Sequence, residues 1–194
     1  FFKKNYWSKL ILQKTFENNN LKNINYNGVS INSKNIKKNN LFFAIKGKNK
    51  DGHMFVKEAL KKGAIKSVVS KKLKQISSNK VIKVKNTFSS LNHLGKITRD
   101  YSSAEIIGIT GSVGKTTLKK LISFALNNYG KVCKSPHSYN NKFGVPLSLA
   151  NLKKNADYGV FEIGMSKKGE INSLSKIVKP EIAVITNISE AHIE

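Results

Sequence analysis

The feature that most constrains the fold is a glycine-rich loop placed between an isoleucine-rich run and an amphipathic segment. Residues 106–109 predict a short buried strand. The loop follows at residues 110–117, and apolar side chains then recur three or four positions apart, at Leu118, Leu121, Ile122, Ala125 and Leu126. This spacing places them on one face of a helix. Strand, glycine loop and helix in this order predict a P-loop at the edge of a parallel α/β sheet.

The loop carries the groups that bind a nucleoside triphosphate. Its glycines let backbone N–H groups turn toward phosphate oxygens, and the helix N-terminus adds a partial positive charge. The Lys115 ammonium can reach the β- and γ-phosphates, and the Thr116 hydroxyl can bind Mg²⁺. The general pattern G-x-x-x-x-G-K-[ST] requires glycine at position 109, where this chain has Ile109, so the loop is a variant. The residues predicted to bind ATP are Thr110, Gly111, Ser112, Val113, Gly114, Lys115, Thr116 and Thr117.

The hydrophobic pattern divides the chain into two α/β parts. Residues 1–85 predict a small domain, with short strands at 29–31, 41–45, 67–70 and 81–84 and helices near the N-terminus and at 55–62. Residues 86–103 predict a linker helix. Residues 104–194 predict part of a central P-loop domain with a mostly parallel sheet, whose further elements are strands at 158–163 and 182–186 and a helix at 171–178.

Composition narrows the class of protein. The chain has 35 Lys and Arg against 11 Asp and Glu, a net charge of +24, but Arg99 alone is arginine. Readers of nucleic acid rely on the arginine fork, so we expect a solvated lysine-rich surface and no nucleic-acid partner. A single cysteine, Cys133, excludes an internal disulfide. No apolar run is long enough to span a membrane, so we expect a cytoplasmic protein without membrane insertion.

Two residues beyond the loop are candidates for the chemistry. Glu162 ends an apolar run, and at the carboxyl end of a parallel strand its carboxylate would share the ligand edge of the sheet, and a Mg²⁺ ion, with Thr116. The alternative is a salt bridge to one of the many lysines. His192 follows the next predicted strand, either as a metal ligand or as a structural or surface histidine.

Taken together, these segments resemble the Mur ligase family, whose members build the peptide stem of the cell wall. In the second half the matching segments are residues 110–116, Asn140-Asn141-Lys142-Phe143-Gly144-Val145-Pro146-Leu147, Glu162-Ile163-Gly164-Met165 with Gly169-Glu170-Ile171, and Thr186-Asn187-Ile188 with Ala191-His192. In the first half, Ser33-Lys34, residues 40–47 and Asp51-Gly52-His53-Met54-Phe55 resemble the uridine-nucleotide domain of the family. The resemblance covers nearly all of residues 28–194.

The resemblance implies roles for individual residues. The catalytic residues would be Lys115, Glu162 and His192, with one Mg²⁺ held by Thr116 and Glu162 and a second by His192. The substrate-binding residues would be Ser33, Lys46, Gly47, Asp51, His53, Asn140 and Asn141. The family's Asp-Ser-Arg motif appears here as Asn32-Ser33-Lys34, and a simple turn role for Asn32 stays an open alternative.

The resemblance also implies an activity. The Asn-Asn-x-x-Gly-x-Pro segment favours the family member that adds D-alanyl-D-alanine to UDP-N-acetylmuramoyl-tripeptide, with ATP and Mg²⁺, through an acyl phosphate in peptidoglycan precursor synthesis. The alternatives are the member that adds the third stem residue, a basic P-loop module that binds nucleotides or nucleic acid, and an inactive homologue. We expect a monomer.

The resemblance further implies that the chain is an N-terminal fragment. The family carries a carbamylated lysine shortly after the position of His192 and a third domain beyond it. We therefore expect the 194-residue chain to have no ligase activity alone.

Overall fold

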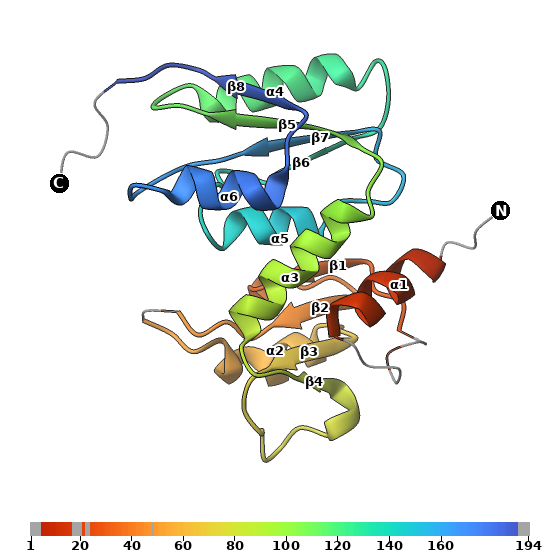
Figure 1. Ribbon diagram of the computed structural model, residues 1–194. Helices are drawn as coiled ribbons and strands as arrows, with labels where there is room; N and C mark the ends of the chain where they lie inside the picture. The colour runs from red at the N-terminus through yellow and green to blue at the C-terminus, as the bar shows by residue number, and fades with distance from the viewer. Residues whose placement is uncertain (1–4, 17–20, 22–23, 48, 190–194) are drawn as a thin grey trace. The chain divides into compact units, whose positions relative to one another are not determined.

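The computed structural model describes residues 5–16, 21, 24–47 and 49–189. The chain forms two compact units, Phe1–Ile97 and Thr98–Glu194, and each is described by itself below (Figure 1). Both units are mixed α/β structures built on parallel sheets, which confirms the predicted fold class.

The first unit holds a four-stranded sheet in the order β1-β2-β3-β4. Its strands are β1 (Gly28–Ser30), β2 (Asn40–Phe43), β3 (Lys66–Val69) and β4 (Val81–Lys83), and all neighbouring pairs are parallel. The helices are α1 (Asn5–Phe16), α2 (Val56–Lys61) and α3 (Thr87–Asp100), with single turns η2 (Ser33–Asn35), η3 (Gly52–Phe55) and η4 (Ser78–Lys80).

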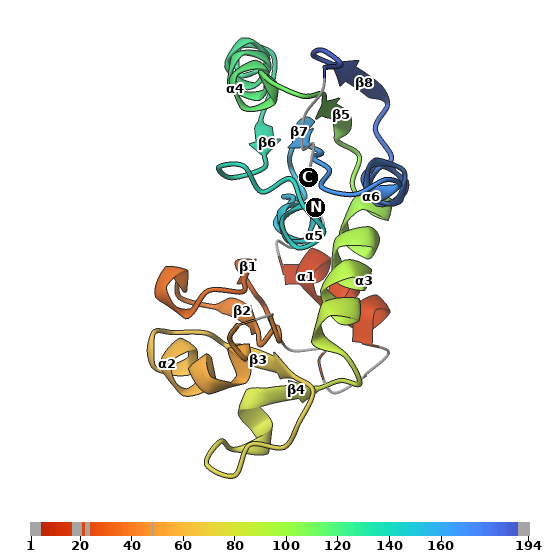
Figure 2. The ribbon, with the colours of Figure 1, turned by 90° about the vertical axis from the view of Figure 1, so that its left-hand side faces the viewer.

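Helices cover both faces of this sheet, and the inner strand β2 is buried along its whole length (Figure 2). Phe42 packs with Val56 and Ala59 of α2 on one face. Phe43 stacks on Phe16 of α1, with ring centroids 6.5 Å apart, on the other. In a parallel sheet that is buried on both faces, the strands lose the alternation of apolar and polar residues. Strand β2, with three consecutive apolar residues after Asn40, shows this loss.

The second unit holds a four-stranded parallel sheet in the order β6-β7-β5-β8. Its strands are β5 (Glu105–Thr110), β6 (Val132–Lys134), β7 (Tyr158–Glu162) and β8 (Ile182–Ile185). Ile109 of β5 is in register with Glu162 of β7, and Thr110 with Ile185 of β8. The carboxyl ends of these three strands therefore meet at one edge of the sheet, where ligands bind in such folds.

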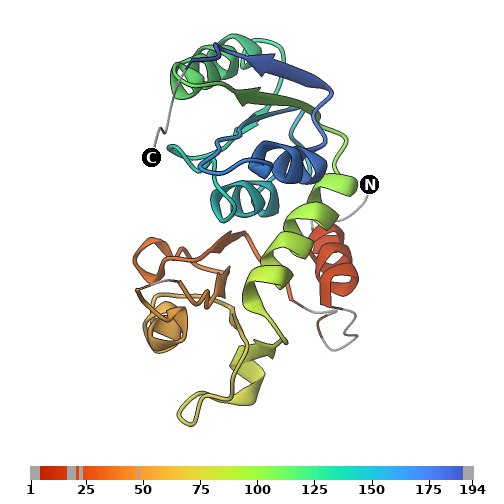
Figure 3. The same ribbon diagram turned by 60° about the vertical axis from the view of Figure 1, so that its left-hand side comes forward.

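Helix α4 (Lys115–Leu126) covers one face of this sheet, and α5 (Gly144–Ala150) and α6 (Glu170–Val178) cover the other (Figure 3). Leu118, Ile122 and Leu126 of α4 pack against the sheet, as their helical spacing predicts. The other two members of the predicted face, Leu121 and Ala125, are exposed. Strand β6 and helix α5 were not expected. All seven residues of α5 are buried, so the helix has no polar face and no helical periodicity in its sequence.

Arg99, the single arginine, has a structural task in the second unit. Its guanidinium donates to the carbonyl oxygens of Val178 (2.8 Å) and Lys179 (2.7 Å) at the end of α6 and pairs with Glu181 at 2.5 Å. A buried cation at a helix C-terminus satisfies carbonyls that have no partner within the helix. Across the described parts of the chain, no helix combines the length and apolarity that a membrane span requires.

Candidate phosphate-binding site

The glycine-rich loop connects β5 to α4 with two left-handed glycines. Gly111 has φ +130° and Gly114 φ +83°, a backbone region that costs glycine little and other residues much. Gly114 is the residue before α4, so the helix begins directly at Lys115. The first N–H groups of a helix have no acceptor within it, and here they follow the turn of the loop. The loop therefore has the backbone shape and the helix dipole that bind phosphate.

The segment after β8 braces the loop from the side. Asn187 accepts from the Ser112 N–H through its carbonyl oxygen and from the Val113 N–H through Oδ1, both at 3.0 Å. The Thr186 hydroxyl donates to the carbonyl oxygen of Val113 at 2.6 Å. A Cβ at Gly111 would lie 2.1 Å from the Thr186 hydroxyl oxygen, so only glycine fits there. The backbone N–H groups of Ser112 and Val113 thus donate to Asn187, so the N–H groups at the start of α4 are the ones that can donate to a ligand.

Lys115 lies over the loop. Its Nζ donates to the carbonyl oxygens of Gly111 (2.5 Å) and Ser112 (2.9 Å). These carbonyls hold the ammonium at the opening of the loop, where a phosphate oxygen could replace either of them as a partner. Thr117, by contrast, is exposed on α4, and Val113 is 65% exposed at the tip of the loop.

Thr116 and Glu162 come together as predicted from the sequence. The Thr116 hydroxyl donates to Glu162 Oε2 at 2.8 Å, although the two residues are 46 positions apart. The Glu162 side chain is only 1% exposed, and it also accepts from Asn140 Nδ2 at 2.8 Å. The Thr116 hydroxyl, at the start of α4, and the Glu162 carboxylate, at the end of β7, are oxygen donors of the kind that Mg²⁺ prefers.

The sequence reasoning missed Lys119. Its Nζ lies 3.1 Å from Glu162 Oε2, and the Lys119 residue is 2% exposed. The same ammonium donates to the carbonyl oxygen of His137, a non-glycine residue with φ +45°. The available signal was position: Lys119 is four residues after Lys115, hence on the same side of α4. The predicted alternative for Glu162, a salt bridge to a lysine, is therefore present together with its contact to Thr116.

The two predicted asparagines differ in what they contact. Asn140 holds Glu162, and a Cβ at Gly164 would lie 2.8 Å from its side chain, so glycine is needed for their close approach. Asn141 Oδ1 accepts from the N–H groups of Phe143 (3.0 Å) and Gly144 (2.9 Å) at the start of α5. Asn141 thus caps a buried helix, while its neighbour reaches the carboxylate.

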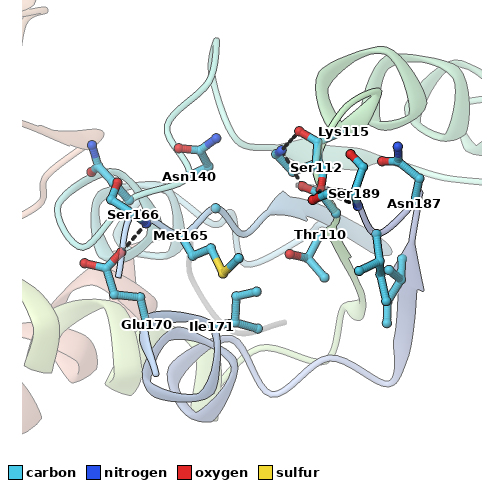
Figure 4. Close-up of a pocket in the computed structure, with 15 residues that line it drawn as sticks. Thr110, Ser112, Lys115, Asn140, Met165, Ser166, Glu170, Ile171, Asn187 and Ser189 are labelled. Carbon is cyan, nitrogen blue, oxygen red and sulfur yellow. Dashed lines mark hydrogen bonds between the residues drawn. The ribbon is translucent and has the colours of Figure 1, made fainter. Parts of the chain in front are cut away.

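A cavity of about 500 Å³ opens beside these groups (Figure 4). It is lined by the loop, by Asn140 and Asn141, by residues 164–166 with Glu170 and Ile171, and by residues at and after the end of β8. Glu170 Oε2 accepts from the Ser166 N–H at 2.7 Å, which lowers the pKa of Glu170 below its ordinary value. Polar groups from three strand ends thus converge on one apolar-lined hollow, the usual form of a ligand site.

The described residues hold no cluster of three or more His, Cys, Asp and Glu side chains that could bind a metal. His192, the predicted second metal ligand, lies outside the described residues.

In the first unit, the predicted substrate residues contact one another. His53, 6% exposed, contacts Asp51 Oδ1 at 2.6 Å through Nδ1 and accepts from the Ser70 N–H at 2.9 Å through Nε2. Asp51 also accepts from Lys71 at 2.7 Å, and this hydrogen bond is the main reason that the pKa of Asp51 lies well below its ordinary value. We call Asp51, His53, Ser70 and Lys71 the histidine cluster.

The remaining predicted substrate residues lie near the same edge of that sheet. Ser33, after β1, donates to Glu58 at 2.8 Å, and Lys62 with Ser33 lowers the pKa of that carboxyl. The backbones of Lys46 and Asp51 form an isolated antiparallel β-bridge, and the Gly47 N–H donates to the Lys50 carbonyl oxygen. Asn32 accepts from the Lys34 N–H at 2.9 Å, which is the turn role left open from the sequence.

Comparison with known families decides the classification of the chain. The profile of the Mur ligase middle domain matches residues 109–194, and the profile of the Mur ligase family catalytic domain matches residues 25–99. The chain belongs to the Mur ligase family. The match to the middle domain includes the loop, Glu162 and Asn187.

Curated relatives support the same classification. A UDP-N-acetylmuramoyl-tripeptide–D-alanyl-D-alanine ligase from Rickettsia prowazekii is 42% identical over 171 residues, which is 88% of this chain and 38% of the relative. The ligase of the same name from Bacillus subtilis is 36% identical over 86% of this chain and 37% of the relative. This Mur ligase chain thus spans about two fifths of the length of such relatives.

Solved Mur ligase structures share the fold. A MurF crystal structure from Acinetobacter baumannii aligns with a TM-score of 0.82 and 29% identity over 95% of this chain and 41% of that one. MurF from Thermotoga maritima in complex with ADP aligns with a TM-score of 0.72 and 35% identity over 86% of this chain and 39% of that one.

Proposed function

We propose that this chain forms the uridine-substrate and ATP-binding parts of a ligase that adds D-alanyl-D-alanine to UDP-N-acetylmuramoyl-tripeptide. The observation that carries the proposal is the contact of Thr116 with Glu162. Thr116 directly follows Lys115, and Glu162 accepts a hydrogen bond from Asn140; Lys115 and Asn140 both line the cavity. The curated relatives that bear this activity in their names support the assignment of substrate.

ATP would bind with its phosphates at the start of α4. The N–H groups of residues 114–116 precede or begin the helix, and the Lys115 ammonium lies beside them, so a triphosphate would meet fixed dipoles and a cation. The structure of MurF from Thermotoga maritima in complex with ADP supports the proposal that this chain binds an adenine nucleotide.

Thr116 and Glu162 fit the binding of Mg²⁺. Mg²⁺ in phosphoryl-transfer sites takes one or two protein oxygens and completes its shell with phosphates and water, so a hydroxyl with one carboxylate suffices. The two oxygens are already 2.8 Å apart, with the Glu162 side chain buried and Thr116 partly exposed. Bound there, the ion would neutralise charge on the phosphates during transfer.

The reaction requires two anions to approach each other. The substrate carboxylate attacks the γ-phosphate of ATP, which gives an acyl phosphate and ADP, and the amine of D-alanyl-D-alanine then attacks the acyl carbon and releases phosphate. Lys115 offsets the repulsion between carboxylate and phosphate, and Asn140 keeps Glu162 directed toward Thr116.

The test uses the chain as it exists. Isothermal titration calorimetry with ADP and Mg²⁺ is expected to show binding at one site. Because the activity belongs to the longer proteins, ligation is assayed in the full-length gene product with UDP-N-acetylmuramoyl-tripeptide and with the corresponding dipeptide. Extension of the tripeptide by D-alanyl-D-alanine supports the proposal, whereas addition of one amino acid to the dipeptide would reassign the substrate.

A further inference from the structure

Glu162 has a buried partner to which the proposed function gives no task. Lys119 Nζ lies 3.1 Å from Glu162 Oε2, and the two side chains are 3% and 1% exposed. An ion pair this deep costs much desolvation, and it persists only where geometry and additional hydrogen bonds compensate both charges. Here both charges are compensated: Glu162 has Thr116 and Asn140, and Lys119 has the carbonyl of His137.

The position of Lys119 relates it to the phosphate loop. It lies one turn after Lys115 on α4, and its ammonium reaches the same carboxylate oxygen as the Thr116 hydroxyl. The ammonium thereby joins α4, the end of β7 and the segment that contains His137. Two lysines on one face of α4 thus have different surroundings: Lys115 lies over the loop, and Lys119 is buried against Glu162.

We propose that Lys119 is a positioning residue that neutralises Glu162 inside the protein, so that a nucleotide phosphate meets the charge of Lys115 without opposition from the carboxylate. This inference rests on the proposed nucleotide site. It assigns the two lysines complementary tasks: one faces the ligand, and the other compensates the acid that lies beside the ligand.

A consequence for binding follows from Coulomb's law. Without Lys119, the Glu162 carboxylate would carry an uncompensated charge next to Thr116, at the start of the helix where the phosphates are proposed to bind. At an effective dielectric constant of about 20, such a repulsion weakens binding by roughly tenfold to a hundredfold. A divalent cation between carboxylate and phosphate would offset that repulsion. Loss of Lys119 therefore weakens ADP binding mainly when Mg²⁺ is absent.

Calorimetric titration of ADP into the chain, once with Mg²⁺ and once with EDTA, tests this. Lys119→Met is expected to weaken binding in EDTA by roughly tenfold or more and to weaken it far less with Mg²⁺. The double variant K119M/E162Q is expected to recover the affinity of the unsubstituted chain in EDTA, because both charges are gone. Lys120→Met, the same charge change at an exposed position of the same helix, is the matched control and is expected to change affinity by about twofold at most.

A fourth variant keeps the test decisive even where Lys119→Met fails to fold. Glu162→Gln leaves Lys119 uncompensated and is expected to strengthen ADP binding in EDTA while it removes most of the gain from Mg²⁺. If K119M weakens ADP binding equally with and without Mg²⁺, or if E162Q leaves the ADP affinity in EDTA unchanged, the proposed role of Lys119 is overturned while the nucleotide site stands. Absence of ADP binding by the unsubstituted chain overturns the nucleotide site and this inference with it.

Discussion

The phosphate loop and the histidine cluster lie at equivalent places in the two units, yet their side chains are used differently. Both sit at the carboxyl edge of a four-stranded parallel sheet. At the loop, Lys115 lines a cavity of about 500 Å³, and the next residue, Thr116, contacts Glu162. In the histidine cluster, Asp51 and His53 satisfy each other and the end of β3.

The hydrogen-bond partners of Lys115 and His53 show which of these two side chains is available to a ligand. Among the described residues, the partners of the Lys115 ammonium are two carbonyl oxygens, which a phosphate can replace, so its charge is available to a ligand. His53 is held by a carboxylate and a backbone N–H, and releasing it would leave buried polar groups unpaired. We infer that the loop binds ligand, while His53 fixes the edge of the first sheet.

The largest expected effect is on the loop itself. Lys115→Ala removes the cation beside the proposed phosphate position and is expected to weaken ADP binding by roughly a hundredfold or more, about 3 kcal/mol. The melting temperature should change little, because the ammonium is only partly buried. Calorimetric titration measures the affinity, with Lys120→Ala on the exposed side of α4 as control. Unchanged affinity would contradict the inference that the loop, unlike the histidine cluster, binds a ligand.

A second change tests how tightly the loop is braced. Gly111→Ala places a methyl group 2.1 Å from the Thr186 hydroxyl oxygen at φ +130°, and is expected to cost about 3 kcal/mol of unfolding free energy, with loss of ADP binding. Gly169→Ala is the matched control, because φ there is +86° but nothing lies within 4 Å of the new methyl group. It should cost about 1 kcal/mol. Equal costs for the two variants would contradict the close approach to Thr186.

The corresponding change in the histidine cluster should separate stability from binding. His53→Ala leaves the Ser70 N–H without its acceptor and removes the imidazole that contacts Asp51, with an expected loss of about 2 kcal/mol in urea unfolding. ADP affinity is expected to stay the same. Met54→Ala, at a 77% exposed neighbour, should change stability by less than about 0.5 kcal/mol. A His53→Ala chain of full stability would show that the cluster is not a structural element.

The smallest expected effect is a change in the acid limb of the stability profile. Asp51 has a lower pKa folded than its ordinary value of 3.8, chiefly through Lys71, so its charge stabilises the fold above that value. The contribution is lost as pH falls below 3.8 and the folded carboxyl becomes protonated. Asp51→Asn should therefore flatten this part of the profile, by about 1 kcal/mol at most because the pair is partly exposed. Thermal melts across the acid range measure it, and parallel profiles for both chains would refute the assignment.

Local patterns in the sequence carried the prediction of the loop. Strand 105–110, the glycines and the periodic face of α4 are contiguous, so spacing alone placed Lys115 and Thr116. The rule that parallel strands end at one edge was enough to bring Glu162 to Thr116 across 46 positions.

What the sequence could not show depends on packing. Lys119 was one of many lysines, and only the fold reveals that its side chain is buried against Glu162. Helix α5 is buried on all sides, so it has no periodic signal. Asn141 lies in a family motif beside Asn140, but only the start of α5 distinguishes a cap from a contact to the carboxylate.

The brace between the segment after β8 and the loop has a consequence for the order of folding. Ser112 and Val113 obtain their partners from residues 74 to 77 positions later in the chain. Such long-range contacts form late, after the entropy of closing the intervening chain has been overcome. A growing chain that has reached α4 but not β8 would have the helix and the motif without the completed loop. Nucleotide affinity would then report, during synthesis, that β8 has docked.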